Sequence, residues 1–247
     1  MDWFADWFNS PYYHLLYRHR NDTEAQLFID NLLAVLKPLP HTHVLDLACG
    51  KGRHARYMAQ KMDWDVTGVD LSPESIAFAQ QWANNNLHFA VHDMRQVFKA
   101  NAFDYVFNFF TSFGYFDSNT ENHQTIAAIH ASLKPNGYLV IDFFNAHKVI
   151  NNLVPAEQQI IEGVQFDITR EMIGQHIVKT IRVTDTAKQF KQTFTERVQA
   201  ITLEDFTDYL TQNGFAIHQV WGNYALRPFN LTTSDRLILV AQSIIDY

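Results

Sequence analysis

The sequence is poor in the features that mark exported or membrane-spanning proteins. Cys49 is the single cysteine in 247 residues, so no intramolecular disulfide can form, which favours a reducing cytosol. No stretch approaches the roughly 20 apolar residues of a membrane span. The first residues mix acids with aromatics and lack the basic start of a signal peptide. We therefore expect a cytoplasmic protein that makes no membrane contact.

Basic residues and metal-ligand patterns are also scarce. Lys and Arg number 19 against 26 Asp and Glu, giving a formal net charge of −7. Such a chain has no electrostatic reason to bind a phosphate backbone, so we expect no nucleic-acid partner. The histidines are scattered and show neither a His-x-x-x-His pair nor a Cys/His ligand set, which predicts that no metal is bound.

Short apolar runs alternate with helical segments through the first two thirds of the chain. This alternation predicts a parallel sheet with helices on both faces. The expected strands are 43–47, 65–69, 87–91, 103–108 and 137–143, with two further strands at 215–221 and 236–241.

The central part of the chain has a different pattern. Residues 163–170, 172–185 and 189–199 are rich in Val, Ile, Thr and Phe that alternate with polar residues, which predicts antiparallel strands. We therefore predict three parts: an N-terminal helical segment at 1–40, a Rossmann-like domain formed by 41–159 and 200–247, and an antiparallel β insertion at 160–199.

A glycine turn and three acids carry the candidate chemistry. The first strand runs into Val-Leu-Asp-Leu-Ala-Cys-Gly-Lys-Gly-Arg-His at 44–54, and its two glycines would let a ligand approach the backbone closely. Asp46 lies on that strand, Asp70 ends the second strand and Asp93 follows the third. A carboxylate can accept hydrogen bonds from a ribose diol or an adenine amino group. A structural turn would also explain the glycines, but three acids beside one crevice favour a ligand.

A dinucleotide site is the rival interpretation of this turn. Residues 50–55 fit a loose G-x-G-x-x-A pattern, and Asp70 lies about 20 residues beyond the first glycine. However, Asp46 on the preceding strand would place negative charge beside a pyrophosphate, whereas a sulfonium and an ammonium group tolerate it. Asp93 also has no role in the dinucleotide pattern.

With these motifs the chain resembles the class I S-adenosylmethionine-dependent methyltransferases, most strongly from Val44 to Phe144. The resemblance implies a Rossmann-like α/β fold with a seven-stranded, mostly parallel sheet, in which residues 236–241 form the antiparallel strand. It implies S-adenosyl-L-methionine as cofactor and methyl transfer to nitrogen or oxygen of a small-molecule acceptor. The implied cofactor contacts are Asp46, Ala48, Cys49, Gly50, Asp70, Leu71, Ser72, Asp93, Met94, Asn108 and Phe109.

Other parts of the predicted site are less constrained by the sequence. The N-terminal segment is interpreted either as a helix that packs an aromatic stripe or as a lid that brings Tyr13, Tyr17 and Arg20 to the cofactor. Asn108-Phe109-Phe110-Thr111 lacks the Asn/Asp-Pro-Pro-Tyr motif of enzymes that methylate nucleobase or glutamine amides, which argues against those acceptors. No catalytic base is assigned, and a non-catalytic sensor that binds the cofactor or its demethylated product stays an alternative. The acceptor-side candidates are Tyr115, Asn145, His147, Tyr224 and Arg227.

Overall fold

The chain forms two compact units, each built from segments that are distant in the sequence. In the computed structural model, residues 5–18 and 22–244 are described. The larger unit comprises residues 22–148 and 201–247, and the smaller comprises 1–21 and 149–200. The sequence pattern had suggested a boundary near residue 40 instead.

A seven-stranded sheet forms the centre of the larger unit. Its strands lie in the order β10-β11-β5-β4-β1-β2-β3. All neighbours pair in parallel except β11, which is antiparallel to both β5 and β10. The predicted fold class and its inserted antiparallel strand are therefore confirmed. The strands are β1 His43–Leu47, β2 Asp65–Asp70, β3 Leu87–Val91, β4 Phe103–Asn108, β5 Leu133–Phe144, β10 Phe215–Trp221 and β11 Arg236–Ser243.

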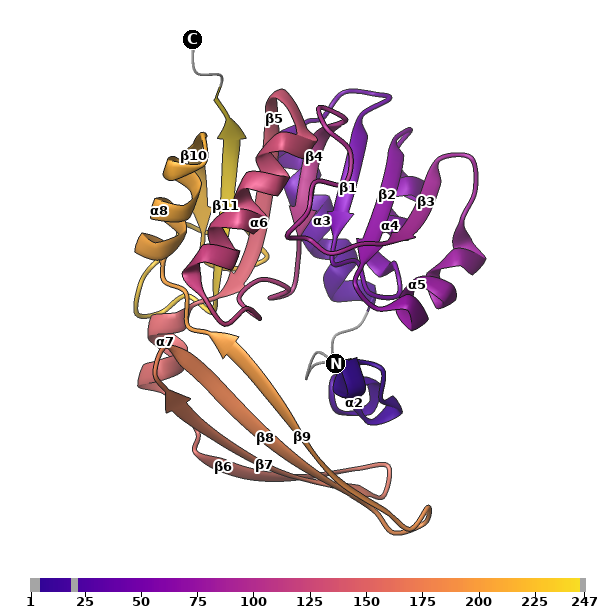
Figure 1. Cartoon of the computed structure of the whole chain (residues 1–247), viewed down its shortest axis with the longest axis vertical. Coiled ribbons are helices and arrows are strands. Elements are labelled where there is room, and N and C mark those ends of the chain that lie inside the picture. Colours follow the sequence, from indigo (N-terminus) through magenta and orange to yellow (C-terminus); the bar gives the residue numbers. More distant parts are fainter. Residues whose placement is uncertain (1–4, 19–21, 245–247) are drawn as a thin grey trace. The chain divides into compact units, whose positions relative to one another are not determined.

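Helices cover both faces of this sheet. Figure 1 shows α6 (Asn119–Ser132) and α8 (Leu203–Gln212) on one face and α3 (Asp22–Leu36) and α4 (Arg53–Lys61) on the other. Side chains of α3, α4 and α5 (Pro73–Ala79) share one buried cluster with β1, β2 and β4. The 3-10 helix η1 (Gln80–Trp82) follows α5, and α7 (Ala146–Asn151) follows β5. This layering leaves the carboxyl ends of the parallel strands as the edge where ligands bind in such folds.

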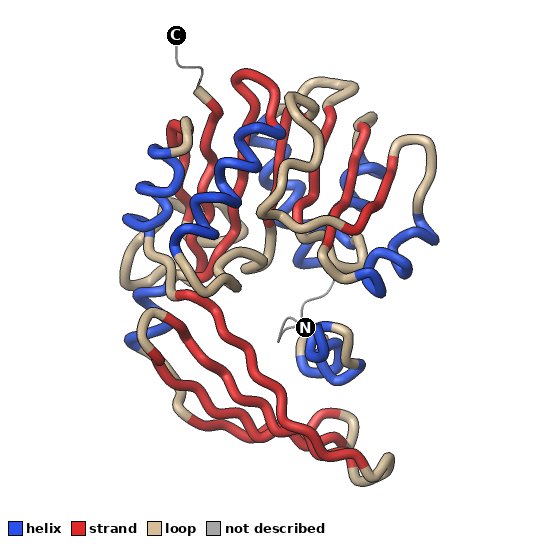
Figure 2. The backbone as a smooth tube through the Cα atoms, in the orientation of Figure 1, coloured by secondary structure: helices blue, strands red, loops and turns tan. Residues whose placement is uncertain are grey.

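The smaller unit is an antiparallel meander with two short helices packed on it. Its sheet has the order β6-β7-β8-β9, which Figure 2 shows as four successive strands. Alternate side chains on β7, such as Phe166 and Ile168, are buried against Trp7, Tyr12 and Leu16. The elements are α1 Ala5–Phe8, α2 Pro11–Leu16, β6 Ala156–Ile161, β7 Val164–Ile173, β8 His176–Asp185 and β9 Phe190–Gln199.

Membrane-spanning helices and metal clusters are both absent from the described residues. None of their helices is long and apolar enough to cross a membrane. The same residues contain no group of three or more His, Cys, Asp or Glu side chains placed to hold a metal ion.

Candidate functional site

The turn that leaves β1 has the geometry of a ligand-approach site. Ala48, Gly50 and Gly52 all have positive φ, at 62°, 54° and 78°. A Cβ at Gly52 would lie 2.6 Å from Cε1 of Phe89, so only glycine fits there. At Gly50 a Cβ would meet no atom of the described residues within 4 Å, which leaves open space on that side of the turn. These two glycines therefore serve different purposes, the second for packing and the first for access.

Asp46 places a carboxyl group beneath this turn. Its residue is only 1% exposed, and one oxygen accepts a hydrogen bond from the backbone N–H of Ala55 at 3.1 Å. Burial raises the pKa of Asp46 to about 7, and the nearby charge of Asp70 adds to the rise, whereas the Ala55 hydrogen bond and Arg53 oppose it. A buried carboxylate without a cationic partner is costly, and a cationic ligand would offset that cost.

Asp70 joins the ends of β1 and β2. Its Oδ2 accepts from the N–H of Gly50 and its Oδ1 from the N–H of Ser72, each at 2.8 Å. Burial raises the pKa of Asp70, and these two amide bonds oppose the rise. An ionised carboxylate has about four lone-pair sites, so two stay available to a diol. Beside it, Leu71 is 38% exposed, and Ser72 caps α5 by accepting from the N–H of Ser75.

Asp93 lies in an ion pair within its own loop. Arg95 Nη2 lies 2.6 Å from Asp93 Oδ2, and Arg95 Nε donates to both carboxylate oxygens. The hydrogen bond from Arg95 lowers the pKa of Asp93, so this group is a carboxylate at neutral pH. The guanidinium also pairs with Glu121 at 2.8 Å. Any adenine contact would thus share Asp93 with Arg95. Met94 between them is half-buried.

The end of β4 presents a polar side chain to β1. Asn108 is fully buried, and its Nδ2 donates to the carbonyl of Leu47 at 2.9 Å. Its Oδ1 is buried and has no hydrogen-bond partner among the described residues. An orphaned acceptor of this kind costs about 1–3 kcal/mol, which a ligand donor would recover. Phe109 is instead a core residue, 3% exposed, with its ring centroid 5.2 Å from that of Phe28.

His54 belongs to this site, although the sequence analysis counted it among the scattered histidines. Its Nε2 is buried and has no hydrogen-bond partner in the described part of the chain, and its ring centroid lies 5.2 Å from that of Phe109 and 4.9 Å from that of Phe110. Burial, aided by the charge of Arg53, lowers the pKa of His54 to about 3, so the imidazole is neutral. The signal was its place two residues after Gly52, on the inward side of the first turn of α4.

The acceptor-side candidates have separate surroundings. Tyr224 Oη donates to Asp142 at 3.1 Å, and its ring lies 5.4 Å from that of Phe110. Asn145 is used by the fold, because its Nδ2 donates to two carbonyls of the loop before β11. Arg227 is exposed, whereas Tyr115 and His147 are half-buried. The ring of Tyr224 thus contacts the loop after β4.

The N-terminal candidates contact the smaller unit. Tyr13 packs its ring against Trp7 at 5.6 Å, and the Oη of Tyr17 donates to Glu196 at 2.8 Å. Lys179 Nζ in turn donates to the Oη of Tyr17. Arg20 lies outside the described residues. The packing interpretation therefore has direct contacts in its favour, while the lid stays a prediction.

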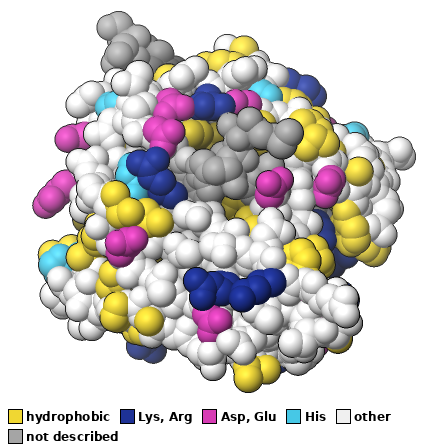
Figure 3. Space-filling model, turned by 60° about the horizontal axis from the view of Figure 1, so that its bottom comes forward, with side chains coloured by type: hydrophobic (Ala, Val, Ile, Leu, Met, Phe, Trp, Pro, Cys, Tyr) yellow, Lys and Arg dark blue, Asp and Glu magenta, His cyan; other side chains and the backbone are white. Residues whose placement is uncertain are grey.

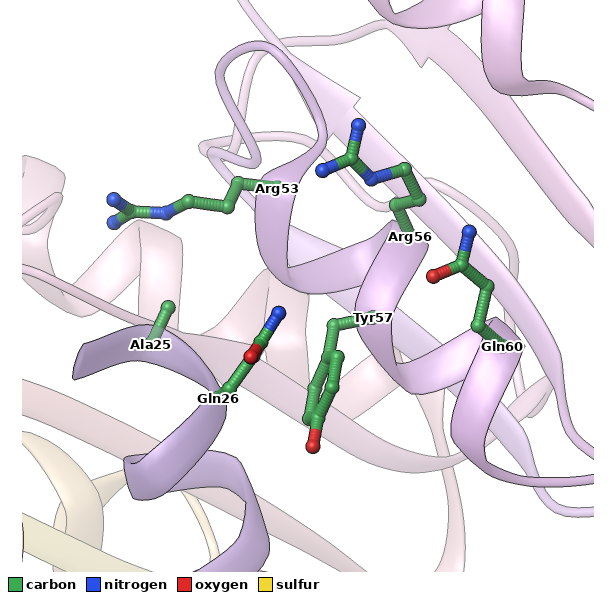
Figure 4. A pocket seen from close by; sticks show the side chains of 6 residues that line it. All are labelled: Ala25, Gln26, Arg53, Arg56, Tyr57 and Gln60. Carbon is green, nitrogen blue, oxygen red and sulfur yellow. The ribbon is translucent and has the colours of Figure 1, made fainter. Parts of the chain in front are cut away.

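A shallow hollow lies between α3 and α4. In Figure 4, Gln26 from α3 and Tyr57 from α4 project into the region between the two helices, with Arg53 and Arg56 on the α4 side. Helix side chains line it, and none of the strand-end acids does. We therefore locate the candidate site at the strand ends.

Comparison with known proteins finds similarity to methyltransferases. The family described as a methyltransferase domain matches residues 44–137. YqeM of Bacillus subtilis, a methyltransferase by name, is 27% identical over 194 residues, which cover 73% of this chain and 76% of that protein. A dTDP-3-amino-3,4,6-trideoxy-alpha-D-glucopyranose N,N-dimethyltransferase of Streptomyces venezuelae is 29% identical over 100 residues, 40% of this chain and 41% of that one.

A solved methyltransferase structure is similar to this chain over the whole fold. The crystal structure of an S-adenosylmethionine-dependent methyltransferase from Clostridium acetobutylicum superposes with a TM-score of 0.80 at 18% identity. It covers 97% of this chain and 99% of that one. Residues 44–137 thus match the methyltransferase-domain family, and the chain has the fold of the class I S-adenosylmethionine-dependent methyltransferases.

Proposed function

We propose that this protein is an S-adenosylmethionine-dependent methyltransferase that acts on a small-molecule acceptor. The observation that carries the proposal is the set of groups at the ends of neighbouring strands. Asp46, Asp70 and Asn108 come from β1, β2 and β4, and Gly50, which follows β1, donates its N–H to Asp70. A methyltransferase-domain match over residues 44–137 supports the same chemistry.

The charges of these residues suit the cofactor. S-adenosylmethionine carries a sulfonium and an α-ammonium group, and the ionised form of Asp46 would stabilise such positive charge. The orphaned Oδ1 of Asn108 would accept from a donor such as the ammonium group. The free lone pairs of Asp70 suit the ribose diol, and the exposed Leu71 offers an apolar surface to the adenine.

The cofactor supplies an activated methyl group, so the chain's task is mainly to orient the donor and exclude water. A neutral His54 and the aromatic rings of Phe109 and Phe110 form an apolar wall beside the turn. We assign no general base, because an acceptor amine that is already neutral needs none.

Several observations support a small acceptor. The Streptomyces venezuelae relative acts, by its name, on an amino sugar, which makes amino sugars and other small amines the first acceptors to try. The acidic balance of the chain disfavours a polyanion, and Figure 3 shows both signs of charge on the face that it presents. We also infer a cytoplasmic location from the single cysteine.

We further propose that the N-terminal segment responds to the cofactor as a lid. Its aromatic side chains suit a surface that is buried only part of the time. Hydrogen exchange in residues 5–18 should slow when saturating S-adenosylmethionine is added. Unchanged exchange there would leave the segment as packing for the smaller unit alone.

Two assays test the function and its alternative. Calorimetric titration with S-adenosylmethionine should give a saturable isotherm, and the absence of binding would refute the proposal. Transfer of a radiolabelled methyl group should then be measured with a panel of amino sugars, amines, hydroxyls and carboxylates. Tight binding with no transfer to any member would favour the sensor over the enzyme.

A further inference from the structure

A buried carboxylate on β5 connects three segments of the larger unit. Asp142 is fully buried. Its Oδ2 accepts from the backbone N–H of Phe110 at 2.9 Å and from Tyr224 Oη at 3.1 Å. Its Oδ1 accepts from Arg236 Nε at 2.7 Å. The donors come from the loop after β4, the loop before β11 and β11 itself.

Arg236 completes this cluster. Its side chain is 19% exposed, and its Nη2 donates to Thr111 Oγ1 at 3.1 Å. The guanidinium also lies 5.6 Å from the ring centroid of Tyr224. A buried ion pair contributes little net stability unless its remaining donors and acceptors are satisfied. Here both partners use their remaining atoms on the loop after β4 and on Tyr224, which suggests a role in ordering those segments.

That loop has an unusual backbone. Phe110 and Thr111 are consecutive residues with φ of 57° and 61°, and neither is glycine. Such residues are strained, so their conformation persists only where the surrounding structure enforces it. Asp142 contacts both amides, because its side chain accepts from Phe110 and its carbonyl accepts from the N–H of Thr111 at 2.9 Å.

The same loop borders the candidate cofactor site. It follows Asn108 directly, and the ring of Phe110 lies 4.9 Å from the ring of His54 and 4.9 Å from Cζ of Arg53. The main-chain carbonyl of Tyr224 accepts from Asn31 Nδ2 on α3 at 2.8 Å. The cluster therefore links the loop both to the glycine-turn helix and to α3.

We propose that Asp142 and Arg236 are positioning residues that hold Phe110 and Thr111 in their left-handed conformation and so preform the acceptor side of the methyl-transfer site. That the loop serves the acceptor side of a methyl-transfer site rests on the proposed function. The holding of the loop does not, and it can be measured on the ligand-free protein.

The test replaces both charges together, so that neither is left buried alone. The variant is Asp142→Asn with Arg236→Gln. Hydrogen-exchange mass spectrometry of the ligand-free protein would follow peptides covering residues 109–116 and peptides from β1 and β2. Exchange should accelerate at 109–116 and stay unchanged in the two strands. Unchanged exchange at 109–116 in a folded variant would overturn the proposal.

Cofactor affinity provides a second readout, with a rescue. If the loop adopts its ordered conformation only a tenth of the time, the Kd for S-adenosylmethionine rises about tenfold. Adding Thr111→Gly removes the strain at one position, so it should restore part of that affinity. The control is His41→Gly, which relieves a positive φ of 58° in an exposed residue before β1 and should restore none. Equal effects of the two glycines would refute the strain argument.

A milder variant covers the case in which the double replacement does not fold. Tyr224→Phe removes one donor to Asp142 and keeps the ring, and it should accelerate exchange at 109–116 to a smaller extent. No acceleration in Tyr224→Phe would then overturn the proposal. If the unmodified protein bound no S-adenosylmethionine, the proposed function would fail, while the exchange experiment would still decide whether the cluster holds the loop.

Discussion

Replacing Asp46 with Asn should stabilise the ligand-free protein while lowering its affinity for a cationic cofactor. Burial raises the pKa of Asp46 from 3.8 to about 7. Between these values the folded protein retains a proton that the unfolded chain has lost, so the free energy of unfolding falls as pH rises from about 4 to 7. At 1.36 kcal/mol per pKa unit, the cost of ionising folded Asp46 reaches about 4 kcal/mol by pH 8.

An amide has no such cost and can still accept the hydrogen bond from Ala55. Urea unfolding should therefore give equal stabilities at pH 4, and a more stable Asp46→Asn protein at pH 8, by an amount on the order of 4 kcal/mol. His54 gives the opposite slope, because its folded pKa of about 3 lies below the ordinary value near 6.5. Comparing variant and parent at each pH removes that contribution.

The expected effect of Asp46→Asn on cofactor affinity is opposite to its effect on stability. At pH 8 the variant lacks the anion that faces the cofactor, so S-adenosylmethionine should bind with about 1.5–3 kcal/mol less free energy. Asp208→Asn, at an exposed carboxylate on α8, is the matched control and should change neither quantity. The reasoning is refuted if Asp46→Asn is no more stable than the parent at pH 8, or if the stability difference does not depend on pH.

Three further outcomes are expected. Asp70→Ala removes the acceptor for the ribose diol and should weaken S-adenosylmethionine binding by about 1.5–3 kcal/mol, and unchanged affinity in calorimetry would exclude that role. Dialysis against a chelator should leave activity intact, and activity restored by a divalent ion would contradict this. Deleting residues 1–18 should expose the apolar side of the β6–β9 sheet, since Trp7, Tyr12 and Leu16 pack there. Dye binding should rise, and an unchanged signal with normal turnover would show that the segment is dispensable.

The sequence predicted the larger sheet well because its strands are short apolar runs with clear ends. The acids at those ends could be named as candidates for the same reason, since a strand end in a parallel sheet has a known location. β6 was missed because Ala156–Ile161 is mostly exposed, with Glu-Gln-Gln at its centre, and so lacks the apolar alternation of its neighbours. α3 was grouped with the N-terminal segment, yet its Phe28, Ile29 and Leu32 belong to the core of the larger unit.

The contacts around Asp142 could not be predicted from local pattern. Its partners Phe110, Tyr224 and Arg236 are separated from it by 32, 82 and 94 positions, and each has an ordinary role when considered alone. Asp142 lies inside an apolar strand, where a single acid gives no sign of which cation will meet it. Such pairings depend on strand register, here Asp142 opposite Ile238, which is fixed only when the whole sheet assembles.

Several energetic costs of the larger unit occur close together, at the ends of β1 and β4. Asp46 is a buried acid, and Asn108 Oδ1 and His54 Nε2 are buried without hydrogen-bond partners among the described residues. Ala48, Phe110 and Thr111 follow the same two strands, and their positive φ angles add backbone strain there. A core selected for stability alone would lose such features, because each is removable by a single substitution. Their concentration at these strand ends is consistent with a site in which a bound cation and its hydrogen-bond donors offset these costs.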